Sequence, residues 1–165
     1  MMKSYKPDSS TLEYFDFVDI NRVSLFLGGS IEEGKAIDWQ TDITNKLSSY
    51  TNLDIFNPRR DNWNADTTQS INDEDFNNQV SWELTCIENC KYAILNFLPN
   101  TKSPISLLEL GLLSRCNPKF TFVCAPDGFW RKGNIEMVCS RYGITLYTSY
   151  EELVDRLINV MDSTQ

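Results

Sequence analysis

The sequence predicts an α/β protein in which a parallel sheet is covered by helices on both faces. Two observations predict this class. Short apolar runs alternate with longer helical segments along the chain, the pattern of βαβ units. The 165 residues are also enough for one domain with a substantial core. In such a sheet, ligands bind beyond the C-terminal ends of the strands.

Five apolar runs are the expected strands, and five strands favour a flavodoxin-like three-layer sandwich with a five-stranded parallel sheet in the order 2-1-3-4-5. The predicted strands are residues 23–27, 53–56, 92–98, 120–124 and 144–147. The predicted helices are residues 36–48, 76–90 and 103–114, one ending near Tyr142, and 150–161. We expect residues 1–22 to be an N-terminal arm that packs on the domain or on a neighbouring subunit, and residues 23–165 to be a single domain.

Composition excludes several classes of function. A formal net charge of −8 argues against nucleic acid or an anionic membrane as a partner. The chain has no histidine, which excludes Ser-His-Asp triads, Cys-His pairs and histidine-ligated metals. Five cysteines, the absence of a signal peptide and the absence of a membrane-spanning apolar run predict reduced thiols and a cytoplasmic protein. We expect neither a metal nor a cofactor.

Glu109 is the candidate for the chemistry of this protein. The segment from Ser103 to Leu113 reads as a helix with Ser103 as N-cap and Pro104 in the first turn. It is apolar except for Ser106 and Glu109. Glu109 is therefore either one solvated acid on an amphipathic helix or a carboxylate in a mostly apolar setting, where burial raises its pKa.

The C-terminal ends of the predicted strands carry further candidates. Gly28, Gly29 and Ser30 end the first strand, and their backbone N–H groups either face a ligand or form a plain tight turn. They do not match G-x-G-x-x-G, so the dinucleotide interpretation is weak. The second strand is followed by arginines that would clamp a phosphate or pair with acidic surface groups. The candidates after the second strand are Asn57, Arg59, Asp61 and Trp63, and the candidate at the end of the third strand is Asn96.

A second carboxylate lies on the helix predicted before the third strand. Glu83 falls on the apolar stripe of that helix, between Val80 and Ile87. It either marks a polar site on that face or extends to solvent from its edge. Two carboxylates with aromatic residues nearby suit chemistry at a glycosidic bond, where one carboxylate attacks or stabilises the anomeric carbon and another orients the sugar or base.

Several segments together resemble the nucleoside 2-deoxyribosyltransferase-like proteins, over about residues 23–147. The segments are Val23 to Lys35, Asp38-Trp39-Gln40, Asn57 to Asp61, Trp82-Glu83-Leu84 and Leu107 to Gly111. In enzymes of this family the Glu of the Glu-Leu-Gly ending is the nucleophile, a role that the resemblance assigns to Glu109. The resemblance also implies a homo-oligomer in which a neighbouring subunit completes the site.

The chain departs from the family pattern at two places. Ser103 stands where the enzymes usually carry an Asp, about six residues before the nucleophile, and Glu83 is the natural substitute for a second substrate-binding Asp. Relatives that hydrolyse deoxynucleoside 5′-monophosphates tend to carry Arg after the Gly-Ser-Ile turn, where this chain has Glu32 and Glu33. These acids favour a nucleoside over a nucleotide, whereas Lys35 and Arg59 argue the other way.

The function expected from the sequence is cleavage of the N-glycosidic bond of a 2′-deoxynucleoside. A covalent deoxyribosyl-Glu109 intermediate would pass its sugar to another base or to water. The alternatives are a non-catalytic nucleoside- or nucleotide-binding module and a hydrolase of a deoxynucleoside monophosphate or NAD. The expected substrate-binding residues are Gly28, Gly29, Ser30, Asp38, Asn57, Arg59, Asp61, Trp63, Glu83, Asn96, Ser103 and Ser106.

Overall fold

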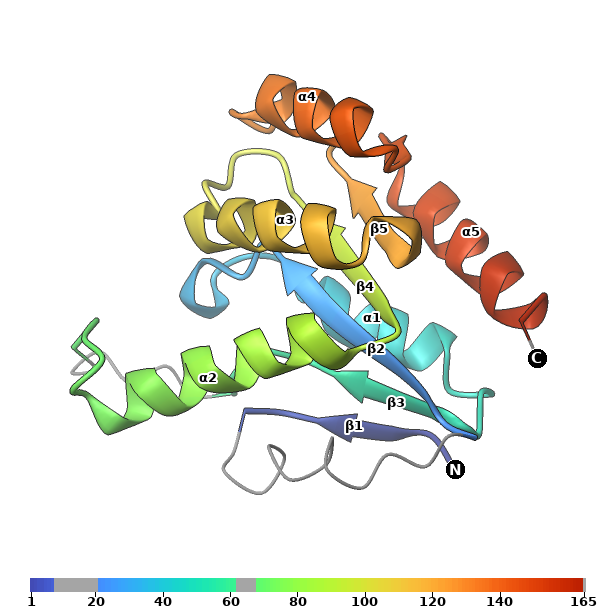
Figure 1. Ribbon diagram of the computed structural model, residues 1–165, viewed down its shortest axis with the longest axis horizontal. Coiled ribbons are helices and arrows are strands. Elements are labelled where there is room, and N and C mark those ends of the chain that lie inside the picture. The colour runs from blue at the N-terminus through green and yellow to red at the C-terminus, as the bar shows by residue number, and fades with distance from the viewer. Residues whose placement is uncertain (8–20, 62–67, 165) are drawn as a thin grey trace.

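The computed structural model describes residues 1–7, 21–61 and 68–164. Its centre is a parallel sheet of six strands in the order β1-β3-β2-β4-β5-β6 (Figure 1). The strands are β1 (Lys3–Tyr5), β2 (Val23–Gly29), β3 (Leu53–Phe56), β4 (Tyr92–Asn96), β5 (Thr121–Cys124) and β6 (Leu146–Tyr147). The α/β class and the relative order of the five predicted strands are confirmed.

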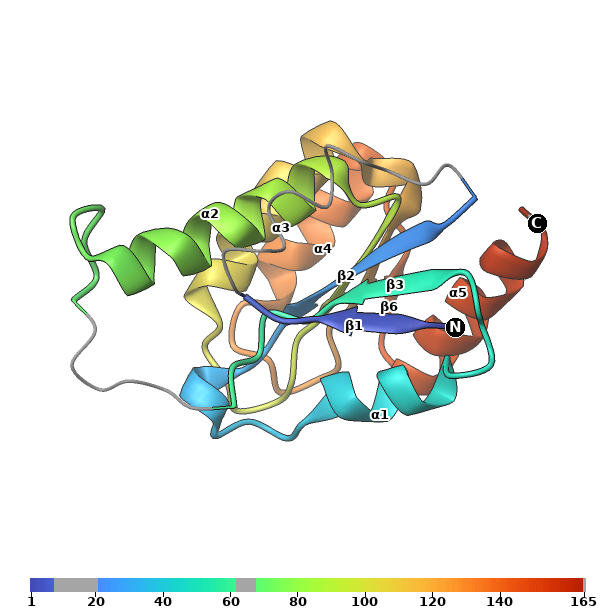
Figure 2. The same cartoon turned by 90° about the horizontal axis from the view of Figure 1, so that it is seen from below.

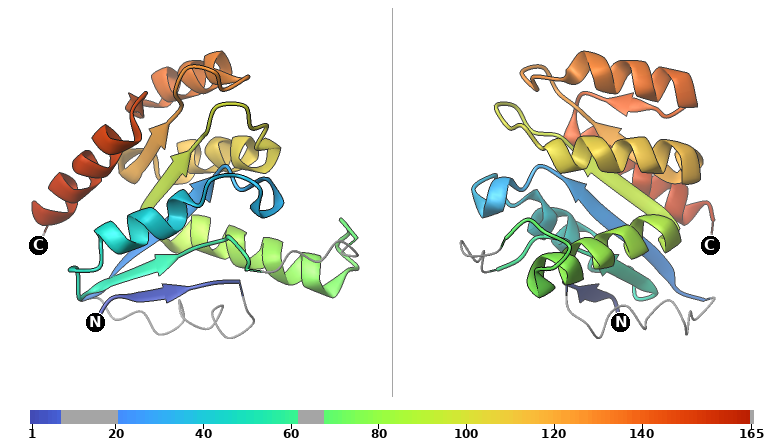
Figure 3. Two further views of the ribbon diagram at one scale, coloured as in Figure 1. Left: turned by 180° about the vertical axis from the view of Figure 1, so that it is seen from behind. Right: turned by 60° about the vertical axis from the view of Figure 1, so that its left-hand side comes forward.

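Helices cover both faces of this sheet. Figure 2 shows α2, α3 and α4 on one face and α1 and α5 on the other. The helices are α1 (Trp39–Lys46), α2 (Glu74–Asn89), α3 (Pro104–Cys116), α4 (Lys132–Tyr142) and α5 (Tyr150–Asp162), with short 3-10 turns η2 (Glu32–Gly34) and η3 (Pro118–Phe120). The three-layer arrangement is also seen from behind and from the side in Figure 3.

The expectation of a five-stranded sheet was wrong by one strand, because the start of the predicted arm joins the sheet. β1 pairs in parallel with β3, in register from Lys3 with Asp54 to Tyr5 with Phe56. The Tyr5 ring stacks on Phe56 with centroids 5.1 Å apart. Three residues, of which two are polar, give no periodic signal, so this edge strand forms through its pairing and not through its own pattern.

Two hydrophobic cores form because side chains alternate across the sheet. One core packs Phe26, Leu95 and Trp82 of α2 between the sheet and α2–α4. The other packs Leu27, Ile94 and residues of α1 and α5 on the opposite face. The alternation therefore decides which helix each residue near the C-terminal ends of the strands will meet.

Small shifts at the predicted ends have local causes. The helix expected from residue 36 begins at Trp39, because Asp38 caps it by accepting a hydrogen bond from Thr41 N at 3.0 Å. Phe120 belongs to η3 and not to the following strand. The last strand is reduced to Leu146–Tyr147, since only these residues pair with β5.

Gly29 provides the first prediction. Its φ is +136°, and a Cβ at this position would lie 2.3 Å from Asn96 O and 2.7 Å from Asn96 N. The nearest atoms all belong to the backbone of Asn96, so no flexible group can yield. Gly29→Ala should therefore lower the free energy of unfolding by about 3 kcal/mol or more. Urea unfolding measures this change.

The matched control is Gly111→Ala in α3, where a Cβ meets nothing within 4 Å. That substitution should stabilise the protein by about 0.5–1 kcal/mol, the ordinary helix preference of alanine over glycine. Equal unfolding midpoints for the two variants would contradict the close approach of Gly29 to β4.

Candidate functional site

The loop that ends β2 lies along α3, and each of its three residues meets a different turn of that helix. Three contacts connect them: Ser30 Oγ lies 2.7 Å from Ser103 Oγ, Ser106 Oγ donates to Gly29 O at 2.8 Å, and a Cβ on Gly28 would lie 3.1 Å from Glu109 Oε2. Residues three apart share one face of a helix. The Gly-Gly-Ser turn and the Glu-Leu-Gly helix therefore form one candidate site.

Glu109 lies inside the protein on this face of α3, with 6% of its surface exposed. Burial, together with the negative charge of Glu83, raises the pKa of Glu109 to about 8. Ser106 acts in the opposite direction by hydrogen bonding to the carboxylate, which lowers the pKa of Glu109. A hydroxyl has one proton, so this bond competes with the bond that Ser106 donates to Gly29 O.

Glu83 lies half-buried on α2 and takes part in a short polar chain. Gln79 Nε2 donates to Glu83 Oε1 and to Pro58 O, and Arg60 Nε donates to Gln79 Oε1. Burial raises the pKa of Glu83, while the bond from Gln79 and the charge of Arg60 offset part of this rise. Both carboxylates are thus held in surroundings that disfavour two negative charges together.

The N-terminus of α3 is capped by a residue from another segment. Ser103 occupies the predicted N-cap position, but its backbone is left-handed (φ 44°, ψ 53°) and its hydroxyl makes no capping bond. Glu32 Oε1 instead accepts bonds from Ser103 N at 2.8 Å, Lys102 N at 3.1 Å and Ser103 Oγ at 3.2 Å. The Glu32 carboxylate therefore satisfies donors that a helix start leaves unpaired.

Ser30 is fully buried and its hydroxyl is held on several sides. Ser30 Oγ lies 2.7 Å from both Thr101 Oγ1 and Ser103 Oγ and accepts from Leu98 N at 2.9 Å. Its backbone O accepts from Trp39 Nε1 at 3.1 Å. These contacts hold the turn that ends β2 against the start of α3.

Arg59, Asn57 and Asp38 support the loop that follows β2. Arg59 Nη2 donates to Gly34 O and Ala36 O, both at 2.8 Å. Asn57 Oδ1 accepts from Arg59 N at 2.9 Å. Burial alone would raise the pKa of Asp38, but bonds from Thr41 and the charge of Arg59 outweigh it and lower the pKa. Arg59 thus holds this loop through Nη2, and a role of Arg59 in binding a ligand stays a prediction.

Asn96 lies at the C-terminal end of β4, at the predicted switch point. The residue is 1% exposed, and neither Nδ2 nor Oδ1 has a hydrogen-bond partner among the described residues. Strand alternation places its side chain on the same face as Ile94, the face of α1 and α5, whereas Glu109 lies on the α2–α4 face. Asn96 and Glu109 thus approach the edge of the sheet from opposite sides.

The remaining predicted residues lie away from Glu109 or outside the described residues. Asp61 pairs with Lys6, and its side chain is 78% exposed, so it ties the N-terminal segment to the loop after β3. Trp63 lies outside the described residues. Sequence reasoning gave Glu32 no structural role, and no signal in its own segment indicates that it reaches the start of α3.

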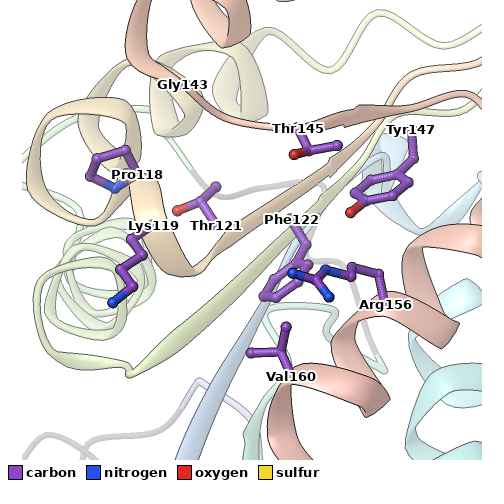
Figure 4. A pocket seen from close by; sticks show the side chains of 9 residues that line it. All are labelled: Pro118, Lys119, Thr121, Phe122, Gly143, Thr145, Tyr147, Arg156 and Val160. Atoms are coloured by element: carbon purple, nitrogen blue, oxygen red, sulfur yellow. The ribbon is translucent and has the colours of Figure 1, made fainter. Parts of the chain in front are cut away.

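A hollow of about 90 Å³ lies elsewhere, at the β5–β6 side of the sheet. Figure 4 shows Arg156 and Tyr147 turned toward it, together with Thr121 and Thr145. It contains none of the predicted site residues. Within residues 1–7, 21–61 and 68–164, no His, Cys, Asp or Glu cluster suited to a metal ion is found. None of the helices in these ranges is long and apolar enough to cross a membrane.

The parallel sheet and the buried carboxylate beside its glycine turn define an α/β protein with a candidate site at the C-terminal ends of its strands. The family model described as "Nucleoside 2-deoxyribosyltransferase like" matches residues 22–129, more than half of the chain. The chain therefore belongs to this family. Among curated proteins, none matches the chain closely enough to count as a relative.

The pKa of Glu109 predicts how stability depends on pH. The folded protein holds a proton on Glu109 up to about pH 8, whereas the unfolded chain releases it near pH 4. The stabilisation linked to this proton is therefore complete below about pH 4 and is lost as pH rises toward 8, by up to about 1.4 kcal/mol per pH unit. Glu109→Gln removes this loss, so its stability relative to wild type should increase over that window.

Urea unfolding of the two proteins at pH 5, 6, 7 and 8 measures the difference. Glu88→Gln on the exposed side of α2 is the control and should show no such trend. A difference between Glu109→Gln and wild type that does not change with pH would show that Glu109 titrates as an ordinary surface acid.

Proposed function

We propose that this protein cleaves the N-glycosidic bond of a 2′-deoxynucleoside with Glu109 as nucleophile. The observation that carries the proposal is the position of Glu109, buried on α3 and directly against Gly28 of the turn that ends β2. Membership of the family supports the same residue, since Glu109 is the acid of the Leu-Leu-Glu-Leu-Gly segment within the matched range.

The reaction proceeds by two substitutions at one carbon. Glu109 attacks C1′ in its ionised form, whose share grows as pH rises toward 8. The bond from C1′ to the base nitrogen breaks, and its electron pair leaves with the base, which takes up a proton. A second base or water then attacks C1′, loses a proton, and releases the Glu109 carboxylate. Two inversions at C1′ retain its configuration.

The surroundings of Glu109 suit this role. Because burial and Glu83 raise the pKa of Glu109, its carboxylate is poorly solvated and therefore a stronger nucleophile than an exposed carboxylate. Glu83 is positioned by Gln79 to accept a hydrogen bond from the sugar or base. Gly28 allows Glu109 to lie close to β2, since a Cβ at Gly28 would be only 3.1 Å from Glu109 Oε2.

A binding module without turnover is the second candidate, and one observation favours it. Ser103, at the position of a family acid, is turned toward Ser30 and Glu32, so it does not replace the lost carboxylate. In this case the protein would hold a nucleoside or nucleotide unchanged. Hydrolysis of a deoxynucleoside monophosphate or of NAD is a further outcome that the same assay detects by its products.

The central test is chromatography of the protein with a 2′-deoxynucleoside panel, with and without an acceptor base. We expect Glu109→Gln to lower product formation at least 1000-fold, because the amide cannot form the glycosyl ester. The wild type should also show a deoxyribosyl adduct by intact-mass analysis. New nucleoside only with acceptor indicates transfer, and free base without acceptor indicates hydrolysis.

Glu88→Gln on the exposed side of α2 is the matched control and should retain activity. Full activity in Glu109→Gln would refute the nucleophile. No product from the wild type, combined with thermal stabilisation by a nucleoside, would establish the binding module instead.

We propose in addition that the protein is a homo-oligomer assembled through α3. Ile105 is 59% exposed, Leu108 63% and Leu112 40%, and their spacing places these apolar residues along one side of the helix that carries Glu109. On the adjacent α4, Met137 is also exposed. A second copy of the chain is the occupant that fits, because it would bring its own site next to the same helix, as the family resemblance implies.

Light scattering coupled to gel filtration tests the assembly. Leu108→Lys should shift the wild-type oligomer to a monomer, because a charge at the centre of an apolar interface is desolvated without a partner. Ile71→Lys, at a residue that is 78% exposed on the loop before α2, is the control and should leave the mass unchanged. A monomeric wild type would overturn the proposal.

A further inference from the structure

Polar side chains also converge on the hollow of about 90 Å³ beside β5 and β6. Two of its lining residues, Phe122 and Tyr147, belong to the core on the face of α1 and α5, whereas α3 with Glu109 packs on the other face. One water takes about 30 Å³ of liquid volume, and pockets for drug-sized ligands measure about 300–1000 Å³. The hollow therefore suits a small ion or one end of a larger ligand, and not a whole nucleoside.

The charge of this hollow is opposite to that of the chain as a whole. The chain has 15 basic and 23 acidic residues and a formal net charge of −8, a balance that repels anions from most of its surface. The residues that line the hollow include Lys119 and Arg156 but no Asp or Glu. This local excess of positive charge favours a negatively charged ligand.

Three side chains offer hydrogen-bond donors to the hollow. Arg156 reaches it from α5, Tyr147 from β6, and Thr145 from the segment before β6 (Figure 4). Among the described residues, none of these three side chains has a hydrogen bond or an ion pair. Lys119 adds positive charge at the rim, where its amine lies over the Phe120 ring, 5.1 Å from the centroid. The three donors are therefore available to a ligand that brings acceptors of its own.

Arg156 has a nearby acid on its own helix and does not pair with it. Glu152 lies four residues before Arg156 on α5, and this order of acid and base gives the better ion pair on a helix. Within residues 1–7, 21–61 and 68–164, no ion pair joins the two side chains. The Arg156 guanidinium lines the hollow instead, where its planar fork can donate two parallel hydrogen bonds to one oxyanion.

We propose that this hollow is a binding site for a phosphate group, with Arg156 as its main ligand. The guanidinium binds two phosphate oxygens, and the hydroxyls of Tyr147 and Thr145 donate to the others. Donors from α5, from β6 and from the segment before β6 arrive from different directions, which fits a tetrahedral phosphate better than a flat carboxylate. The site lies on the other face of the sheet from Glu109, so the inference goes beyond the proposed function and requires nothing of it.

Titration calorimetry with inorganic phosphate at constant ionic strength tests this site. The wild type should bind one phosphate saturably, and Arg156→Gln should bind it at least tenfold more weakly, because hydrogen bonds to a charged group are lost. Tyr147→Phe removes only a hydroxyl and should weaken binding about threefold. The matched control is Arg131→Gln at the start of α4, where the guanidinium lies over the Trp130 ring, 4.3 Å from the centroid. This variant has the same change of charge and should bind phosphate as the wild type does.

A second measurement locates the ion and identifies its source. In ¹H–¹⁵N spectra, phosphate should shift the amide signals of residues 119–122 and 143–147, which surround the hollow, and leave those of the Gly28–Ser30 turn unchanged. The titration is repeated with a nucleoside 5′-monophosphate and with the nucleoside alone. Equal affinity for phosphate and the monophosphate would support the site and identify the free ion as its ligand. Tighter binding of the monophosphate, lost in Arg156→Gln, would support the site with a phosphorylated molecule as its ligand.

This inference and the proposed function can fail separately. Equal affinity of the wild type and Arg156→Gln for phosphate would overturn the inference, and so would the absence of saturable binding by the wild type. Shifts confined to the Gly28–Ser30 turn would also overturn it, because the ion would then bind at the candidate site beside Glu109. Absence of any product from the wild type in the chromatographic assay would refute cleavage by Glu109 and leave the phosphate site standing.

Discussion

The close contact between the Gly28–Ser30 turn and α3 is the constraint on which the site depends. Gly29 lies against the backbone of β4, with no room for a Cβ beside Asn96, and Ser106 and Ser103 bind the next atoms of the turn. This contact sets where α3 lies along the sheet, and therefore where Glu109 is placed. A helix displaced by one residue would turn Glu109 away from Gly28, because neighbouring helical positions differ by about 100°.

Burial of two carboxylates has a cost that the fold accepts at this site. Glu109 and Glu83 each have a raised pKa, which means that the ionised form of each would be more stable in water than in the protein. The Arg60–Gln79–Glu83 chain compensates part of this cost through an amide placed between the cation and the acid. An amide keeps Arg60 from neutralising Glu83 by direct contact, which preserves the charge that acts on Glu109. Such surroundings are typical of functional sites, where local stability is lower than the packing allows.

Much of this architecture could be predicted from the sequence, because it depends on local pattern. The runs ending at Leu27, Phe56 and Cys124 have the length and composition of buried strands, and Glu109 stands out on an apolar helix. The structure decides between the two interpretations of Glu109 in favour of burial. The resemblance to the deoxyribosyltransferase-like proteins is confirmed by the family match. The assignment of reaction, substrate and oligomer stays a prediction.

What could not be predicted depends on contacts between distant segments. The cap of α3 comes from Glu32, about 70 residues earlier in the chain. Ser103 is the residue that the local sequence predicts as the cap, but its side chain makes no capping hydrogen bond. The bonds that Arg59 donates to Gly34 and Ala36 also join segments distant in the chain and have no local signal. Asn96 was correctly placed at the end of a strand. The face of the sheet on which its side chain lies follows from the alternation along the strand and not from the residue type.

The three-residue strand β1 has a consequence for handling the protein. It covers the side of β3 that would otherwise present unpaired backbone groups, and it is itself short and carries Lys3. Exposed sheet edges pair readily with other chains, and short charged strands suppress such pairing. Deleting the first residues, or fusing a bulky tag directly before Lys3, would uncover the apolar strand Leu53–Phe56 and favour aggregation. A tag at the C-terminus, after α5, leaves this protection in place.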